Sequence, residues 1–92
     1  MAKGPPFNAQ AAISVIEQHI DDAIDRVTDN YATTLEVDLS PWYKVLKSKP
    51  AVARTIENIY TQDDVGWSSA KITTWEGKPG ESDGARITLS IV

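Results

Sequence analysis

The sequence predicts an α+β fold, in which a small antiparallel sheet of about three strands has helices packed on one face. From Ala9 to about Tyr31, apolar residues recur every three or four positions, which is typical of a long amphipathic helix. Apolar and polar residues alternate over 33–39 and again over 85–91, which is typical of half-buried strands. The expected order is helix, strand, one or two helices, strand and strand.

The composition is that of a small globular domain. Of 92 residues, 41% are hydrophobic and 24% are charged, so residues 1–92 are expected to form a single compact domain. Because cysteine is absent, disulfides, thiolate metal sites and a thiol nucleophile are excluded. The N-terminal region lacks the apolar run of a signal peptide, and no segment is apolar enough to span a bilayer. We therefore expect a cytoplasmic protein that does not bind membranes.

The first predicted helix has a defined start. Residues 1–7, which include Gly4-Pro5-Pro6, are expected to be an extended lead-in, because consecutive prolines do not begin a helix. Asn8 is the expected N-cap, with Phe7 packing back near Ala12. The apolar stripe comprises Ala9, Ile13, Ile16, Ile20, Ala23, Ile24, Val27 and Tyr31. The opposite arc is acidic and comprises Glu17, Asp21, Asp22, Asp25 and Asp29.

The middle of the chain predicts one strand and two short helices. The segment 33–39 is expected to be a half-buried strand. Its odd-numbered residues share one face, and its even-numbered residues share the other; the odd-numbered ones are Thr33, Leu35, Val37 and Leu39. Ser40 then resembles an N-cap followed by Pro41 at the first helical position. Pro50 interrupts this helix and is expected to begin another, and Gly66 is expected to end that segment.

The last third of the chain predicts a hairpin. Its strands span Trp67–Trp75 and Ala85–Ile91, and the linking sequence EGKPGESDG is rich in turn-forming residues. The link is expected to be a flexible tip of the kind that often contacts partners. The residues expected to point inward are Ala70, Ile72, Ala85, Ile87, Leu89 and Ile91.

The outward face of this hairpin is one candidate site. Strand alternation places Trp67, Lys71 and Trp75 on one side, and Arg86 joins them from the neighbouring strand. Three interpretations of this face are open. The tryptophans belong to a packed layer, the face binds a protein, or nucleic-acid bases stack on the aromatic rings. However, the two tryptophans would lie about 26 Å apart along a strand, too far to form one aromatic platform.

The acidic arc of the first helix is the other candidate site. Asp21, Asp22 and Asp25 are helical neighbours, so their carboxylates are dense on one face. Such a face binds a basic partner, holds a divalent cation loosely, or is solvated and keeps the protein soluble. The net charge of −4 argues against nonspecific attraction to nucleic acid.

No pattern in the sequence predicts catalysis. His19 is the only histidine, and it lacks the further ligands that a zinc site requires. Asp63 and Asp64 are adjacent at a predicted helix end, where carboxylates are usually caps or solvated charges. Lys78 lies in the glycine-rich link, but Pro79 follows it, so a phosphate-binding loop is not indicated. We expect no enzyme, no cofactor and no metal.

The sequence therefore favours a non-catalytic interaction or regulatory protein that binds another protein or itself. The amphipathic stripe has a heptad-like spacing that also suits pairing between two copies. Two alternatives remain: a small nucleic-acid-binding domain using Trp67, Lys71, Trp75 and Arg86, and a structural subunit of a larger assembly. The cues "LEVDLS" and "IYTQDDVGW" resemble those of short bacteriophage reading frames, which implies a viral accessory protein acting in the host cytoplasm.

Overall fold

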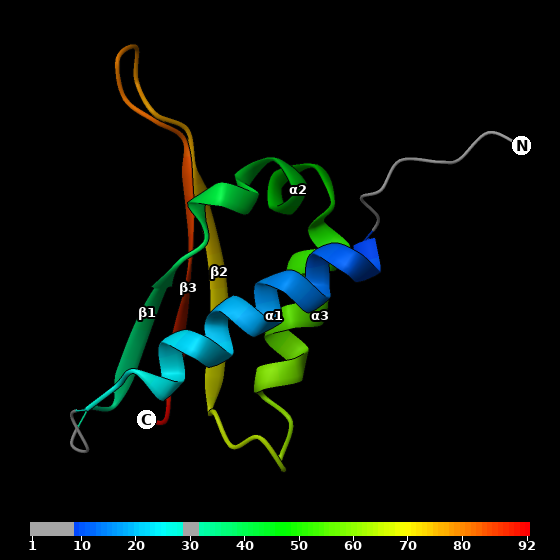
Figure 1. Cartoon of the computed structure of the whole chain (residues 1–92), viewed down its shortest axis with the longest axis vertical. Coiled ribbons are helices and arrows are strands. Elements are labelled where there is room, and N and C mark those ends of the chain that lie inside the picture. Colours follow the sequence, from blue (N-terminus) through cyan, green and yellow to red (C-terminus); the bar gives the residue numbers. More distant parts are fainter. Residues whose placement is uncertain (1–8, 29–31) are drawn as a thin grey trace, which may run out of the picture.

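The computed structural model describes residues 9–28 and 32–92. The elements are α1 (Ala9–Asp25), β1 (Thr34–Asp38), the 3-10 helix η1 (Ser40–Trp42), α2 (Tyr43–Ser48), α3 (Pro50–Tyr60), β2 (Ser69–Trp75) and β3 (Gly84–Ser90). The strands form one antiparallel sheet in the order β1-β3-β2, and the helices pack against it (Figure 1). The α+β prediction is confirmed. The expected lead-in, the Phe7 and Asn8 cap, Asp29 and Tyr31 lie outside the described residues.

The core lies between the sheet and the helices. On the central strand β3, Ala85, Ile87 and Leu89 are each 0% exposed, so the predicted alternation is confirmed there. The helices and β1 supply the other buried apolar residues, which are Ile16, Ile20, Val37, Leu39, Leu46, Val52, Ile56 and Tyr60. In the described part of the chain, no helix combines the length and the apolar character needed to cross a membrane.

The first helix is shorter than its apolar stripe predicts. It ends at Asp25, and the amide groups of Arg26 and Val27 bond to carbonyls three residues earlier. Val27 is 42% exposed and is not one of the buried core residues. The prediction that it belongs to the apolar stripe of the helix is therefore wrong. The sequence after Arg26 is Val-Thr-Asp-Asn, and β-branched residues, Asp and Asn all lower helix propensity. The spacing of apolar residues alone does not reveal this loss of helix propensity.

Ser40 is not the N-cap that the sequence predicts. It is the first residue of η1, and Leu39 occupies the cap position without a side-chain hydrogen bond. Instead, the Asp38 carboxylate accepts hydrogen bonds from the Ser40 hydroxyl at 2.5 Å and from the Ser40 amide at 3.1 Å. These bonds hold the pKa of Asp38 below its usual range. The Asp38 side chain therefore stabilises the turn between β1 and η1 by bonding to the residue two positions later.

The hairpin is confirmed, with shifted ends. β2 begins at Ser69, two residues later than expected, and β3 spans Gly84–Ser90. Ile91 was expected to point inward, but it follows the end of β3 and is 53% exposed. Thr33 likewise precedes β1 and is exposed. Alternation predicts which side a residue faces, but it does not predict where the helices stop covering the sheet.

The backbone of each edge strand forms a hydrogen bond with a side chain from a helix. On β1, the Asp38 carbonyl accepts a hydrogen bond from the His19 Nε2 atom at 2.9 Å. On β2, the Ile72 amide donates to the Glu57 carboxylate at 2.8 Å. Unpaired strand edges invite pairing with other chains, so α1 and α3 each block part of an edge. The larger open surface is the sheet face on which none of the helices in residues 9–28 and 32–92 packs.

Candidate functional site

The outer sheet face is the surface that the helices leave open. We define it by Thr34, Glu36 and Asp38 of β1, Ser69, Lys71, Thr73 and Trp75 of β2, and Gly84, Arg86, Thr88 and Ser90 of β3. The strand register places these side chains in cross-strand rows, such as Glu36–Thr88–Lys71. Most of the residues are exposed, and the face is rich in hydroxyl groups. It is therefore a polar surface with one large aromatic ring.

That ring belongs to Trp75, which lies over the backbone of β3. Trp75 pairs with Gly84, and a Cβ atom built on Gly84 would lie 2.2 Å from the indole. Only glycine allows this close approach, and the ring in turn buries Gly84. The Arg86 guanidinium lies 5.4 Å from the centroid of the indole, within cation–π range. Trp75 remains 40% exposed, so the positioned ring is accessible.

Arg86 links the indole to β1. Its Nη1 atom lies 3.5 Å from a carboxylate oxygen of Glu36, and both side chains are about half exposed. An exposed ion pair of this kind stabilises the fold by at most about 1 kcal/mol. Its main effect is to limit where the guanidinium can lie. We call Glu36, Trp75, Gly84 and Arg86 the Trp75 cluster.

Trp67 does not share this face, so that part of the prediction is wrong. It precedes β2, where strand alternation no longer applies, and it packs against the core. Lys71 and Arg86 do lie on the outer sheet face with Trp75, as expected. Three of the four predicted residues therefore share the outer sheet face, and of these Arg86 lies against the Trp75 ring.

The loop between β2 and β3 projects beyond the helices (Figure 1). Its tip is a hydrogen-bonded turn, in which the Glu81 amide donates to the Lys78 carbonyl at 2.7 Å. Pro79 and Gly80, with φ of +92°, occupy the positions that a type II turn requires. The Asp83 carboxylate also accepts a bond from the Gly77 amide at 2.9 Å. The predicted flexible tip is thus an internally bonded arm.

The base of this arm is attached to α2. The Glu76 carboxylate pairs with the Lys47 ammonium and accepts a hydrogen bond from the Tyr43 hydroxyl at 3.3 Å. The Lys47 ammonium in turn donates to the Tyr43 hydroxyl at 3.1 Å. These contacts hold one side of the arm, and the Trp75 cluster lies on the other.

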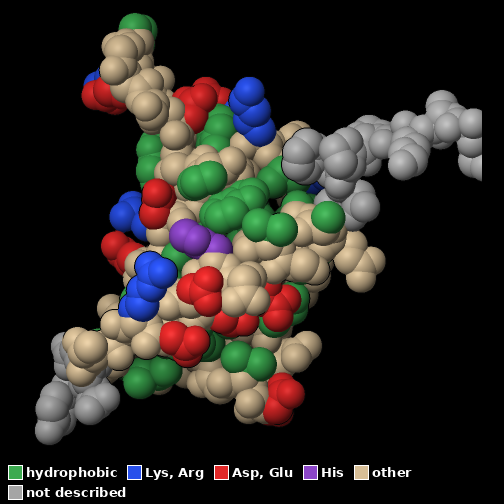
Figure 2. Space-filling view, in the orientation of Figure 1, with side chains coloured by type: hydrophobic (Ala, Val, Ile, Leu, Met, Phe, Trp, Pro, Cys, Tyr) green, Lys and Arg blue, Asp and Glu red, His purple; other side chains and the backbone are tan. Residues whose placement is uncertain are grey.

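The acidic arc is divided between structural and exposed carboxylates. Figure 2 shows acidic side chains gathered over α1. The Asp21 carboxylate accepts a hydrogen bond from the buried Tyr60 hydroxyl at 2.7 Å, which ties α1 to α3. Asp22 accepts one from the Gln18 side chain at 2.9 Å, and Asp25 is exposed. Of the three predicted binding residues Asp21, Asp22 and Asp25, Asp21 carries this contact between α1 and α3, and Asp22 and Asp25 can be changed without removing it.

His19 also has a structural position. Besides its bond to the Asp38 carbonyl, its ring packs against Trp42 with the centroids 4.9 Å apart. In residues 9–28 and 32–92, no three or more His, Asp or Glu side chains gather as a metal site would require.

Sequence reasoning missed Gly84 and Glu36 as members of the Trp75 cluster. Glycine beside a predicted strand resembles a turn residue, and Glu36 resembles any outward strand residue. The register that pairs Trp75 with Gly84 places a large ring opposite the residue that leaves room for it, but this register is known only from the structure. Comparison with known proteins adds no further residues, because the chain matches no family model, no curated protein and no solved structure.

Proposed function

We propose that this protein is a non-catalytic interaction protein that binds another protein through the outer sheet face and the 76–83 arm. The observation that supports this most is the exposed Trp75 ring, which lies against Gly84 and Arg86 on the sheet face that the described helices leave uncovered. Tryptophan and arginine are the side chains most enriched among residues that dominate binding energy. Because the contacts described above position Trp75 and Arg86 before binding, less side-chain entropy is lost when the partner binds.

The size of the surface explains why the arm belongs to the site. The three strands, of five, seven and seven residues, cover only about 300 Å². A standard protein interface uses about 800 Å² from each partner. The face alone is too small, and the projecting arm is the adjoining surface that extends it (Figure 1).

The charges on the face favour a protein partner over nucleic acid. The outer sheet face carries two acids, Glu36 and Asp38, and two bases, Lys71 and Arg86. Nucleic acid requires clustered basic groups along its phosphates. An aromatic ring and an arginine surrounded by polar residues match the aromatic centre and polar rim of a protein interface.

Trp75→Ala is expected to weaken partner binding at least tenfold. The immobilised full chain would be used to capture proteins from the source cells, and each captured partner would then be purified and its Kd measured. The matched control is Val15→Ala, because Val15 is 53% exposed on α1, away from the outer sheet face. Thermal unfolding of both variants would show that each is folded.

Two results would contradict the proposal. A partner that binds Trp75→Ala as tightly as the wild type, but loses affinity for Asp22→Lys or Asp25→Lys, would move the site to the acidic arc. Capture that is abolished by nuclease and by Lys71→Glu, with affinity falling steeply as salt rises, would establish the nucleic-acid alternative.

A further inference from the structure

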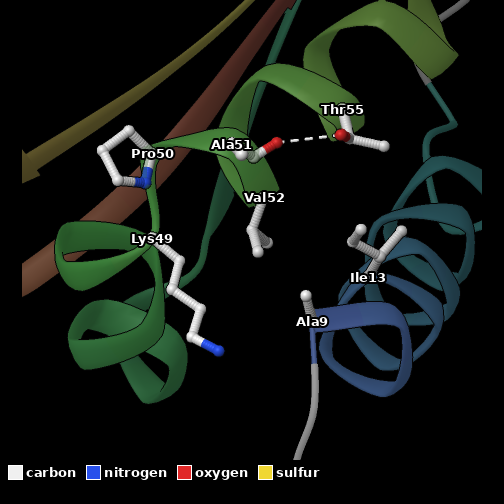
Figure 3. Close-up of a pocket in the computed structure, with 7 residues that line it drawn as sticks. All are labelled: Ala9, Ile13, Lys49, Pro50, Ala51, Val52 and Thr55. Atoms are coloured by element: carbon white, nitrogen blue, oxygen red, sulfur yellow. Dashed lines mark hydrogen bonds between the residues drawn. The ribbon is translucent and has the colours of Figure 1, made fainter.

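A second candidate site lies on the helix side, between the first turns of α1 and α3. It is an apolar hollow with a volume of about 320 Å³. Ala9 and Ile13 of α1 face Val52 of α3 across it (Figure 3). The hydroxyl of Thr55, which also lines the hollow, donates to the Ala51 carbonyl at 2.8 Å. The wall therefore presents carbon atoms and no unsatisfied hydroxyl.

Lys49 is the one charged residue among those that line the hollow. Figure 3 shows its side chain extending along the opening, with the ammonium group on the side of Ala9. Neither of the ion pairs in the described part of the chain involves Lys49. An apolar wall with a single cation at the rim is complementary to a ligand with an apolar body and one anionic end.

We propose that this hollow binds a small amphiphilic carboxylate, with the alkyl or aryl part against Ala9 and Ile13 and the carboxylate at Lys49. The volume is at the lower end of the range for small-molecule sites, so the ligand has a single short chain or one ring. The hollow shares no residue with the outer sheet face. Ligand binding in the hollow can therefore be tested independently of partner binding at the outer sheet face.

The test is a titration of the ¹⁵N-labelled full chain with butyrate, hexanoate and octanoate, followed by the amide shifts of Ile13, Ala51 and Thr55. The expected result is saturable shifts with a Kd of millimolar order for octanoate. Affinity is expected to rise with chain length, by up to about fourfold per added CH₂, until the hollow is filled. Octylammonium is expected to bind at least tenfold more weakly, because its charge repels Lys49.

Two variants examine the charge and the hollow separately. Lys49→Glu is expected to weaken octanoate binding at least tenfold, whereas Lys44→Glu makes the same charge change at an exposed position of α2 outside the hollow. Ala51→Phe places a ring at an exposed lining position and is expected to abolish the shifts. The proposal is overturned if no saturable shift appears by tens of millimolar octanoate. It is equally overturned if octylammonium matches octanoate, if the two glutamate variants behave alike, or if Ala51→Phe still binds.

Discussion

Ile87→Ala is expected to lower the free energy of unfolding by about 3 kcal/mol. Ile87 is 0% exposed at the centre of β3, where it pairs with Val37 on one side and Ile72 on the other. Removing a buried aliphatic group loses its transfer free energy and leaves a cavity that the two neighbouring strands only partly close. Urea denaturation followed by circular dichroism would measure the change.

The size of this effect matters because the domain is small. A 92-residue chain is stabilised by roughly 5–14 kcal/mol in total, so the loss is a substantial fraction. The matched control is Ile91→Ala, since Ile91 has the same side chain but is 53% exposed after β3 ends. That change should alter stability by less than about 0.5 kcal/mol. Similar losses for the two variants would show that the inner face of β3 is wrongly assigned.

Tyr60→Phe is expected to lower the free energy of unfolding by about 1.5 kcal/mol. Only the hydroxyl is removed, so the packing of the buried ring stays. The hydroxyl lies 2.7 Å from a carboxylate oxygen of Asp21 and 3.1 Å from the Glu17 carbonyl, and both acceptors lose this donor. Hydrogen bonds to charged acceptors are stronger than those between neutral groups. Tyr43→Phe is the control, because the Tyr43 hydroxyl bonds only exposed side chains.

The contribution of Tyr60 should also depend on pH. Burial, followed by the hydrogen bond to Asp21, raises the pKa of Tyr60 above its usual value of 10. A raised pKa in the folded state stabilises the protein below the unfolded pKa, and this stabilisation is lost as pH rises above about 10. The stability difference between wild type and Tyr60→Phe should therefore be constant up to about pH 9 and narrow above pH 10. A difference that widens at high pH would contradict the buried, hydrogen-bonded hydroxyl.

The sheet and its helices were predictable because local periodicity and burial agree. Val37, Leu39, Ile87 and Leu89 are inward by alternation, and they are buried because helices cover that face. Pro50 begins α3 for a reason visible in the sequence, since a fixed φ and a missing amide donor are tolerated only at a helix start. Where one physical cause determines the local structure, the sequence is sufficient.

The candidate site was predictable only in part, because it depends on contacts between strands. The outward positions of Lys71, Trp75 and Arg86 follow from alternation. The position of Trp67 away from the outer sheet face does not follow from alternation, because Trp67 lies before the first residue of β2, Ser69. The approach of the indole to Gly84 requires the strand register, which the residue pattern alone does not supply.

The most direct measurement of the proposed interaction surface is site-specific photo-crosslinking in the source cells. A photoreactive residue would replace Thr73 on the outer sheet face in one variant and Asp22 on α1 in another, both exposed positions. We expect a discrete covalent adduct with another protein from position 73, lost when Trp75→Ala is added, and no adduct from position 22. An adduct from position 22 alone, or one from position 73 that survives Trp75→Ala, would contradict binding through the Trp75 cluster.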